Sequence, residues 1–126
     1  MDNVFFLILA ILTGILFIGL GVPLALRKVS PNHWYGLRIP ATLSNEKVWY
    51  EANEHCGKHF ILIGIGIIIV AVILDVLVAA ILTKVLFWSG LVLISTFHMV
   101  FHQWRHANRL ENKLSYNKAK RDSDLK

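Results

Sequence analysis

Several features are scarce or absent in this sequence, and each absence narrows the class of protein. There is one cysteine, Cys56, so an intrachain disulfide is excluded and a reduced cytoplasmic thiol is expected. There is no HExxH zinc motif, no nucleophile elbow and no glycine-rich phosphate loop, which argues against the common hydrolase and nucleotide-binding classes. Acidic residues number 8 against 13 lysines and arginines, a formal net charge of +5. The sequence therefore has to be interpreted mainly from its apolar runs and from where its basic residues lie.

Three long apolar stretches predict an all-α membrane protein with a single domain. Residues 4–26 contain one polar side chain, Thr13, and residues 60–82 contain only Asp75. The third stretch covers 85–104 if Gln103 and Trp104 are included. At about 1.5 Å of rise per residue, each can cross a hydrocarbon layer of about 30 Å. We expect the chain to reverse near Thr83–Lys84, and the segment 105–126 to form a tail that is weakly helical as far as Ser115.

The distribution of basic residues predicts the orientation. The connection 27–58 carries five lysines and arginines, the tail carries seven, and the turn between the second and third spans carries only Lys84. The positive-inside rule then places the connection and the C-terminus in the cytoplasm and the N-terminus outside. The acidic start of the chain does not fit a secretory signal, so we expect the first span to be retained. Because the charges flank spans, lipid headgroups rather than nucleic acid are the expected polyanion.

Asp75 is the one acidic residue inside an apolar stretch. An ionised aspartate at mid-span is unfavourable by roughly 3 kcal/mol. Helical spacing places it with Gly64 on a stripe of small residues, so we expect it to face the bundle, with Thr13 and Ser89 as candidate partners. Two roles stay open: a hydrogen-bonded contact between helices, or a proton or ion relay in a small transporter or channel subunit.

The histidines suggest a metal site. His98, His102 and His106 recur every four residues, so one helix face carries all three, and the outer two are about 12 Å apart. One ion can bind at most two of them, completed by His55, His59, Cys56 or Glu54 from the preceding helix. The predicted ligands are His55, His59, His98 and His102, with a divalent metal as the only cofactor considered. The alternative is an interfacial polar stripe, continued by Arg109 and Lys113, that contacts lipid headgroups.

The polar segment between the first two spans is the most informative part of the chain. Pro31, Gly36 and Pro40 interrupt regular structure, so residues 30–42, here called the strap, are expected to be ordered but non-helical. Thr42 or Ser44 can then cap an interfacial helix that runs into the second span. One face of that helix is expected to be packed; it carries Trp49, Ala52, Asn53, Cys56, Gly57 and Phe60. A buried Asn53 needs hydrogen-bond partners, which the strap backbone or Asn32 can supply.

The same segment resembles a known family. The resemblance is carried by Pro31-Asn32, Tyr35-Gly36, Arg38, Pro40, Thr42, Trp49, Asn53 and Gly57, preceded by Gly21 and Pro23. This pattern is similar to the signature region of SdpI-like bacterial membrane proteins, a family named after the immunity protein of a sporulation-delaying toxin system. It covers roughly residues 19–58. The resemblance implies a non-enzymatic protein of toxin immunity or signalling that meets a peptide toxin or a cytoplasmic regulator.

The resemblance and the helix face together select candidate residues for binding a partner or ligand. They are Asn32, Tyr35, Gly36, Arg38, Pro40, Thr42, Trp49 and Asn53. The alternative is that the segment only seats an interfacial helix, with Arg38 bound to lipid phosphate, Glu46 or Glu51. A metal-dependent membrane-embedded enzyme is the second functional hypothesis. Homo-oligomerisation is left open.

Overall fold

The computed structural model describes residues 2–124, and all of the regular secondary structure in that range is α-helix. Its helices are α1 (Asp2–Ala25), α2 (Pro40–Leu43), α3 (Glu46–Leu77) and α4 (Ile81–Asp124). Three of these, α1, α3 and α4, are long and apolar enough to cross a membrane. The predicted all-α architecture with three spanning helices is therefore confirmed.

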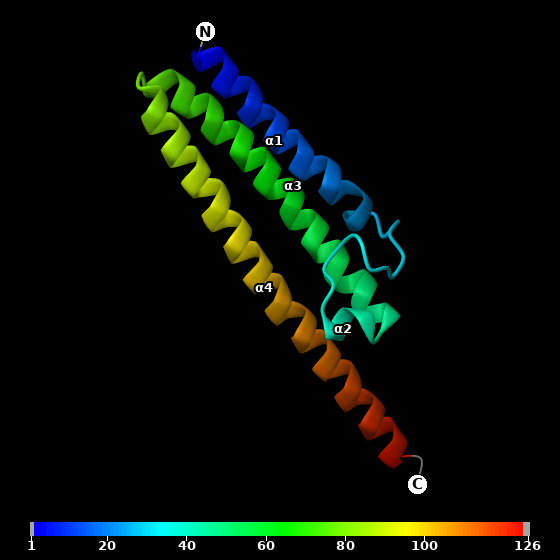
Figure 1. The fold of residues 1–126 in the computed structure, drawn as a ribbon. Coiled ribbons are helices and arrows are strands. Elements are labelled where there is room, and N and C mark those ends of the chain that lie inside the picture. The colour runs from blue at the N-terminus through cyan, green and yellow to red at the C-terminus, as the bar shows by residue number, and fades with distance from the viewer. Residues whose placement is uncertain (1, 125–126) are drawn as a thin grey trace.

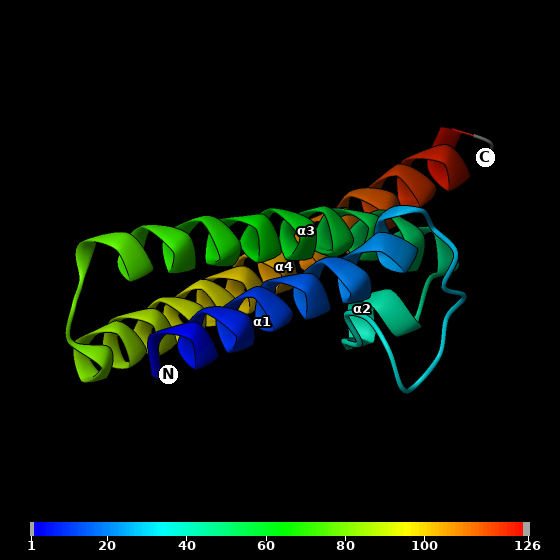
Figure 2. The same ribbon diagram turned by 90° about the horizontal axis from the view of Figure 1, so that it is seen from above.

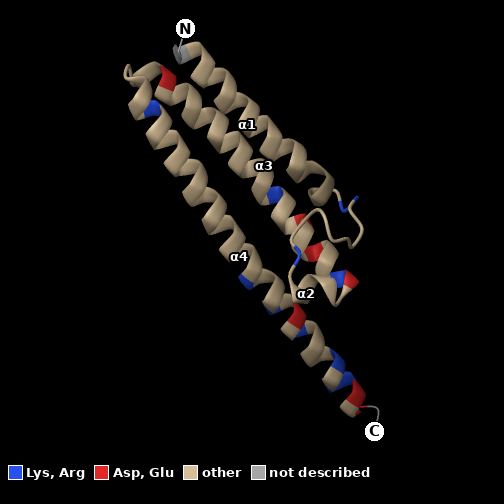
Figure 3. Cartoon of the chain, in the orientation of Figure 1, with Lys and Arg blue, Asp and Glu red and all other residues tan. Residues whose placement is uncertain are grey.

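The long helices run side by side and define two ends of the molecule. The start of α1 and the α3–α4 turn share one end, here called the hairpin end (Figures 1 and 2). The strap and α2 lie at the opposite end, here called the strap end. Charged residues gather at the strap end and along the final part of α4, while the long apolar parts carry almost none (Figure 3).

Helices α1 and α3 pack with their backbones in close approach. A Cβ placed on Gly14 would lie 2.7 Å from the Gly64 carbonyl, and one on Gly64 would lie 2.6 Å from the Gly14 carbonyl. Gly21 and Gly57 are related in the same way, at 2.6 and 2.5 Å. The glycines are seven residues apart on each helix, so two turns separate the contacts and both fall on one face. Small residues at such positions allow the close packing that membrane helices use in place of the hydrophobic effect.

The reversal between α3 and α4 lies at residues 78–80, earlier than the predicted Thr83–Lys84. Val78 ends α3 in an extended conformation, with φ −115° and ψ 114°, and its N–H donates to the Leu74 carbonyl. The turn contains no glycine, proline or asparagine, so turn-forming residues could not mark its position. As a result, the end of α3 and the start of α4 both lie earlier in the chain than the predicted end of the second span and start of the third.

Helix α4 is longer than predicted. It continues to Asp124 instead of losing its structure after Ser115, and its 44 residues correspond to about 66 Å. A hydrocarbon layer of about 30 Å accommodates less than half of that length. The buried Ala107 and the half-buried Leu110 and Leu114 share one face of the extension, as the amphipathic pattern predicted.

Contacts of α4 with the rest of the molecule are concentrated at its start and in its middle. Its buried residues are Lys84 at the hairpin end and Met99, Gln103 and Ala107 toward the strap end. Between residues 85 and 98 no side chain of α4 is fully buried. Trp88 is half-buried and meets the Phe6 ring edge to face, with ring centroids 6.1 Å apart. Helix α4 is therefore held at its start and in its middle, where the Ser44 hydroxyl also donates to the Glu111 carboxylate at 3.0 Å, and the segment between these contacts is more open.

Candidate functional site

The chain leaves α1 through a left-handed residue. Arg27 has φ 55°, its N–H donates to the Leu24 carbonyl, and the Lys28 N–H donates to the Pro23 carbonyl. This pair of bonds is the Schellman ending of a helix, which usually places glycine at the left-handed position. A side chain there is unfavourable by about 1–2 kcal/mol. The backbone conformation therefore does not explain an arginine at position 27, whereas its charge does.

The charge of Arg27 is used in an ion pair with α3. Its guanidinium lies 2.6 Å from Glu54, and Lys58 binds the other carboxylate oxygen at 2.5 Å. The hydrogen bonds from Lys58 and from Arg27 lower the pKa of the Glu54 carboxyl below its ordinary value. Glu54 thus fastens the entry of the strap and is engaged by two cations.

The first half of the strap is shaped by Asn32. Its Oδ1 accepts hydrogen bonds from the backbone N–H groups of Trp34 and Tyr35, each at 2.8 Å, and its amide donates to the Ser30 carbonyl. This is an Asx turn, in which the side chain replaces a backbone partner. The Tyr35 hydroxyl donates to the Leu20 carbonyl of α1. The turn therefore directs Tyr35 inward onto α1.

The middle of the strap rests on Asn53 of α3. Asn53 is buried; its Oδ1 accepts the Leu37 N–H at 2.6 Å and its amide donates to the Trp49 carbonyl at 3.0 Å. Gly36 has φ 104°, and a Cβ on it would lie 2.5 Å from the Asn53 Oδ1. Glycine is thus required there both for its conformation and for the approach of Asn53. The prediction that Asn53 binds strap backbone is confirmed.

The second half of the strap is closed by Thr42. Its hydroxyl donates to the Leu37 carbonyl at 2.7 Å, and its oxygen accepts the Ile39 N–H at 3.0 Å. Thr42 is buried within the short helix α2, so it does not cap α3. Asn45 does, by accepting from the N–H groups of Lys47 and Val48. The helix expected at the interface is the first part of α3 and is continuous with the second span.

Trp49 joins the start of the strap to α3. It is fully buried, and its indole N–H donates to the Val29 carbonyl at 2.9 Å. The anticipated face of α3 is confirmed, because Trp49, Ala52, Asn53, Cys56 and Gly57 are all buried. Helix α3 therefore holds the chain just before the strap, at Val29, and in the middle of the strap, at Leu37, while Thr42 closes the second half of the strap internally.

The predicted binding residues fall into two groups in the structure. Thr42, Trp49 and Asn53 are buried, and Asn32, Tyr35 and Gly36 are partly buried and shape the strap; Arg38 and Pro40 are exposed. The Arg38 guanidinium donates to the His33 carbonyl. Trp34, which sequence reasoning did not select, is 90% exposed. An aromatic residue in the middle of an Asx turn was the signal available for it.

A cavity of about 220 Å³ lies beneath the strap, where α1, α3 and α4 meet. Tyr35, Cys56, Met99 and Gln103 are among its lining residues. Burial raises the pKa of the Cys56 thiol to about 11, so the thiol is protonated and unreactive at neutral pH. Burial, and secondarily Cys56, also raises the pKa of Tyr35. These groups do not provide a nucleophile or a general base at neutral pH.

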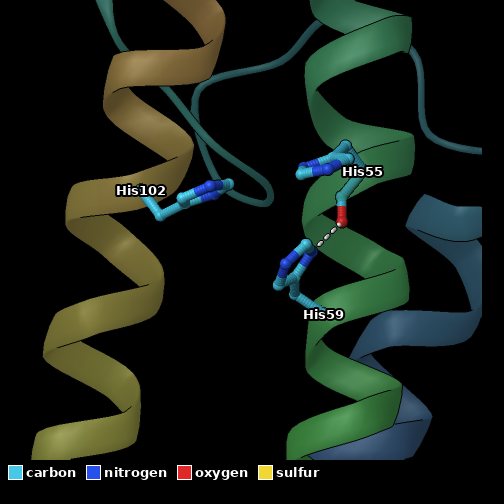
Figure 4. Close-up of side chains that lie close together, drawn as sticks. All are labelled: His55, His59 and His102. Carbon is cyan, nitrogen blue, oxygen red and sulfur yellow. Dashed lines mark hydrogen bonds between the residues drawn. The ribbon is translucent and has the colours of Figure 1, made fainter.

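Three of the predicted metal ligands are brought together at the strap end. His55 and His59 lie one turn apart on α3, and His102 points toward them from α4 (Figure 4). One ring nitrogen from each lies within 4.8 Å of the others. His55 and His59 are half-buried, while His102 is exposed. Of the alternative ligands, Glu54 is engaged by Arg27 and Lys58, and Cys56 is a buried free thiol outside the group of three.

The other two histidines of α4 flank this group. His98 lies one turn away, with its ring centroid 6.2 Å from that of His102, and is outside the group of three. His106 stacks on His55 with centroids 4.3 Å apart and an interplanar angle of 8°. Burial, and then the charges of His55 and His102, lower the pKa of His106. Five of the six histidines in the chain therefore form one contiguous cluster, and only His33 is separate.

Asp75 is paired at the hairpin end with a residue that was not predicted. Its carboxylate lies 2.9 Å from the Lys84 ammonium, which also donates to the Asp75 carbonyl. Thr13 and Ser89, the expected partners, instead bond to the carbonyls of Leu9 and Leu86 in their own helices. The earlier reversal of the chain brings Lys84 opposite Asp75. The ion pair gives Asp75 a structural partner across the turn.

The comparisons with known proteins agree with the sequence pattern of the strap. A family model described as the SdpI/YfhL protein family matches residues 28–101. No curated protein and no solved structure shows significant similarity to the chain. The match covers the strap, α3 and the first half of α4.

Proposed function

Since the chain belongs to the SdpI/YfhL protein family, we propose that it is a non-enzymatic protein of toxin immunity or signalling whose strap binds a partner. It is a membrane protein of the SdpI type, with three helices able to span a bilayer. The partner is a peptide toxin or a cytoplasmic regulator. The surface proposed to meet it consists of Trp34 and Arg38.

The observation that carries this proposal is an ordered strap that exposes a tryptophan. An unstructured linker between two spans would not need a buried asparagine, a buried threonine and a buried tryptophan to hold it. These groups fix the loop at positions on either side of Trp34 and Arg38. Burying a large apolar side chain is favourable by about 1.5–3 kcal/mol, so a fixed, exposed Trp34 has that free energy to gain on binding. Tryptophan and arginine are also the residues that most often dominate protein interfaces.

The charge distribution supports a cytoplasmic position for this surface. Twelve of the thirteen lysines and arginines belong to the connection 27–58 and the tail, and the remaining one is Lys84. Lys84 is 1% exposed and paired with Asp75, so the hairpin end presents no free basic group among the described residues. The positive-inside rule then favours a cytoplasmic strap and C-terminus with the N-terminus outside.

Survival of cells challenged with a peptide toxin of the sporulation-delaying type tests the proposal. Trp34→Ala and Arg38→Ala should each lower survival by more than tenfold while the amount of protein in the membrane stays unchanged, because both side chains are exposed and the hydrogen bond from Arg38 to the His33 carbonyl lies at the surface. Lys47→Ala is the matched control, since Lys47 is exposed on the first turn of α3. Wild-type protection by the double variant Trp34→Ala/Arg38→Ala would exclude this surface.

The same variants separate a partner surface from a membrane anchor. Tryptophan and arginine can also bind the headgroup region of a bilayer. In that case Trp34→Phe, which keeps an interfacial aromatic ring, should retain full protection, and Arg38→Lys should as well. A partner surface that uses the indole and the planar guanidinium would lose protection with both conservative variants.

A further inference from the structure

We infer that His55, His59 and His102 form a binding site for a zinc-type divalent cation between α3 and α4. The site is independent of the proposed strap surface, since it uses neither Trp34 nor Arg38. Its three ligands come from two helices that meet mainly at the start and in the middle of α4. Its occupant would therefore join α4 to α3 at the strap end.

The spacing of the three rings suits a single ion. Their candidate ligand nitrogens lie within 4.8 Å of one another, and a tetrahedral Zn²⁺ with bonds of about 2.0–2.1 Å requires nitrogens about 3.4 Å apart. Rotation of the exposed His102 side chain can supply the remaining shift of about 1–1.5 Å. His55 and His59 are four residues apart, a spacing that places two ligands on one helix face.

The hydrogen bonds of the two α3 histidines prepare the nitrogens that would bind the ion. The His55 Nδ1 lies 2.9 Å from the Gln103 Oε1, and the His59 Nδ1 lies 3.0 Å from the His55 carbonyl. Both partners are oxygens that only accept, so each Nδ1 carries the proton. Each neutral ring then has its lone pair on Nε2. Metal-binding histidines typically show this arrangement, with the second nitrogen donating to a carbonyl or similar oxygen.

Gln103 is positioned as a support for this site. It is completely buried on α4, one residue after His102, and its Nε2 has no hydrogen-bond partner in residues 2–124. A buried amide group without a hydrogen-bond partner is unfavourable, so a glutamine at this position needs an explanation. The contact with His55 explains why an amide occupies this position instead of an apolar side chain. It also places the site beside the cavity beneath the strap, which Gln103 lines.

The chemistry of the ligands limits the ion. Three imidazoles and no carboxylate favour Zn²⁺, Cu²⁺, Ni²⁺ or Co²⁺ over Mg²⁺ or Ca²⁺, which prefer oxygen ligands. Glu54 is engaged by Arg27 and Lys58, and the buried thiol of Cys56 lies outside the group of three. With three protein ligands, at least one coordination position is left for water or another group.

Titration of the purified protein with Zn²⁺ alone tests the site. The protein should carry a purification tag without histidine, be stripped with a chelator, and be studied by calorimetry in detergent or nanodiscs. Wild-type protein is expected to bind one equivalent. His102→Ala should weaken binding by more than about tenfold, and Gln103→Leu by about 10- to 100-fold although all three ligands remain. His33→Ala is the control that should bind as wild type, since His33 is outside the cluster.

Two further measurements distinguish loss of the metal site from loss of folding. Zn²⁺ should raise the melting temperature of the wild type and of His33→Ala but not of His102→Ala. Co²⁺ bound to the wild type should give the visible absorption of a four- or five-coordinate site without sulfur-to-metal charge transfer. Absence of saturable binding by the wild type, an octahedral Co²⁺ spectrum, or undiminished Zn²⁺ binding by His102→Ala would each overturn the inference.

Discussion

Helix α3 makes two very different contacts, one with α1 and one with α4. Along α1 the backbones touch at two pairs of glycines, and the strap is bound onto the same two helices. Along α4 the contact depends on polar side chains at two places, the Asp75–Lys84 pair at the start of α4 and the His55–Gln103 hydrogen bond in its middle. Backbone packing cannot adjust without separating the helices, whereas side-chain contacts can be broken one at a time. The difference suggests a rigid unit of α1, α3 and strap, to which α4 is fastened at two points.

Substitution of a contact glycine should have the largest effect. A side chain on Gly57 would meet the Ala25 nitrogen at 2.4 Å and the Gly21 carbonyl at 2.5 Å, and both are backbone atoms that cannot move aside. We expect Gly57→Val to lower the free energy of unfolding by at least about 3 kcal/mol, or to prevent accumulation in the membrane. Gly66→Val is the matched control on the same helix, because nothing lies within 4 Å of a Cβ there. Thermal unfolding in detergent compares the two; equal loss in both would contradict the close α1–α3 packing.

Breaking the ion pair at the hairpin end should have the next largest effect. Asp75→Asn leaves the buried Lys84 ammonium without its counter-charge, so we expect a loss of about 2–3 kcal/mol, less than for a fully buried pair because Asp75 is 28% exposed. The double variant Asp75→Leu/Lys84→Leu should recover most of that loss, because it buries no unpaired charge. A double-mutant cycle on melting temperatures measures the coupling. Additive effects of the two single leucine substitutions would show that the pair does not fasten α4.

Loosening the strap should have a smaller effect that stays local. Asn53→Ala leaves the Leu37 N–H without its acceptor, and we expect a loss of about 1–2 kcal/mol. The strap should become sensitive to limited proteolysis. The two contacts of α4 with α3, at Lys84 and at Gln103, should stay in place. Asn112→Ala is the control, since Asn112 is exposed on the tail of α4. A strap that stays resistant in Asn53→Ala would mean that the amide does not hold it.

The ion pairs of Glu54 should give the smallest effect, and it should depend on pH. The pKa of Glu54 is lower in the folded protein than in the unfolded chain, so its contribution is present at neutral pH and is lost as the pH falls through the folded pKa. The melting temperature of Glu54→Gln should therefore be slightly below that of the wild type at pH 7. The difference should shrink as the pH falls below about 4.5. A difference that grows on acidification would reverse the sign of the pKa shift.

Sequence reasoning recovered the fold and the inward face of α3 because both follow from periodicity. Apolar runs of sufficient length define the spans, and helical spacing alone places Trp49 and Asn53 on the packed side. Two prolines and a glycine likewise marked the strap as non-helical, which is correct for residues 30–39 but wrong for 40–42, where α2 begins. The Asn53 contact with strap backbone could be predicted because a buried amide must have partners.

Contacts between residues of different helices, and the exposure of a loop residue, could not be predicted from periodicity and turn-forming residues. The α3–α4 turn has no turn-forming residue, so a shift of a few residues hid the pairing of Asp75 with Lys84. The choice of His102 rather than His98 as a neighbour of His55 depends on the relative rotation of two helices. Trp34 was overlooked because exposure of a loop residue depends on which way the Asx turn faces. Each of these requires the tertiary arrangement.

Hydrogen–deuterium exchange of the wild-type protein tests the rigid unit of α1, α3 and strap most directly. The bound strap amide of Leu37 and its neighbours should exchange slowly, in the same range as the start of α3, because they open only when the unit opens. The exposed last turns of α4, residues 116–124, should exchange fast and serve as the internal reference. Strap amides that exchange as fast as that reference would contradict an ordered strap, and with it the surface proposed for the partner.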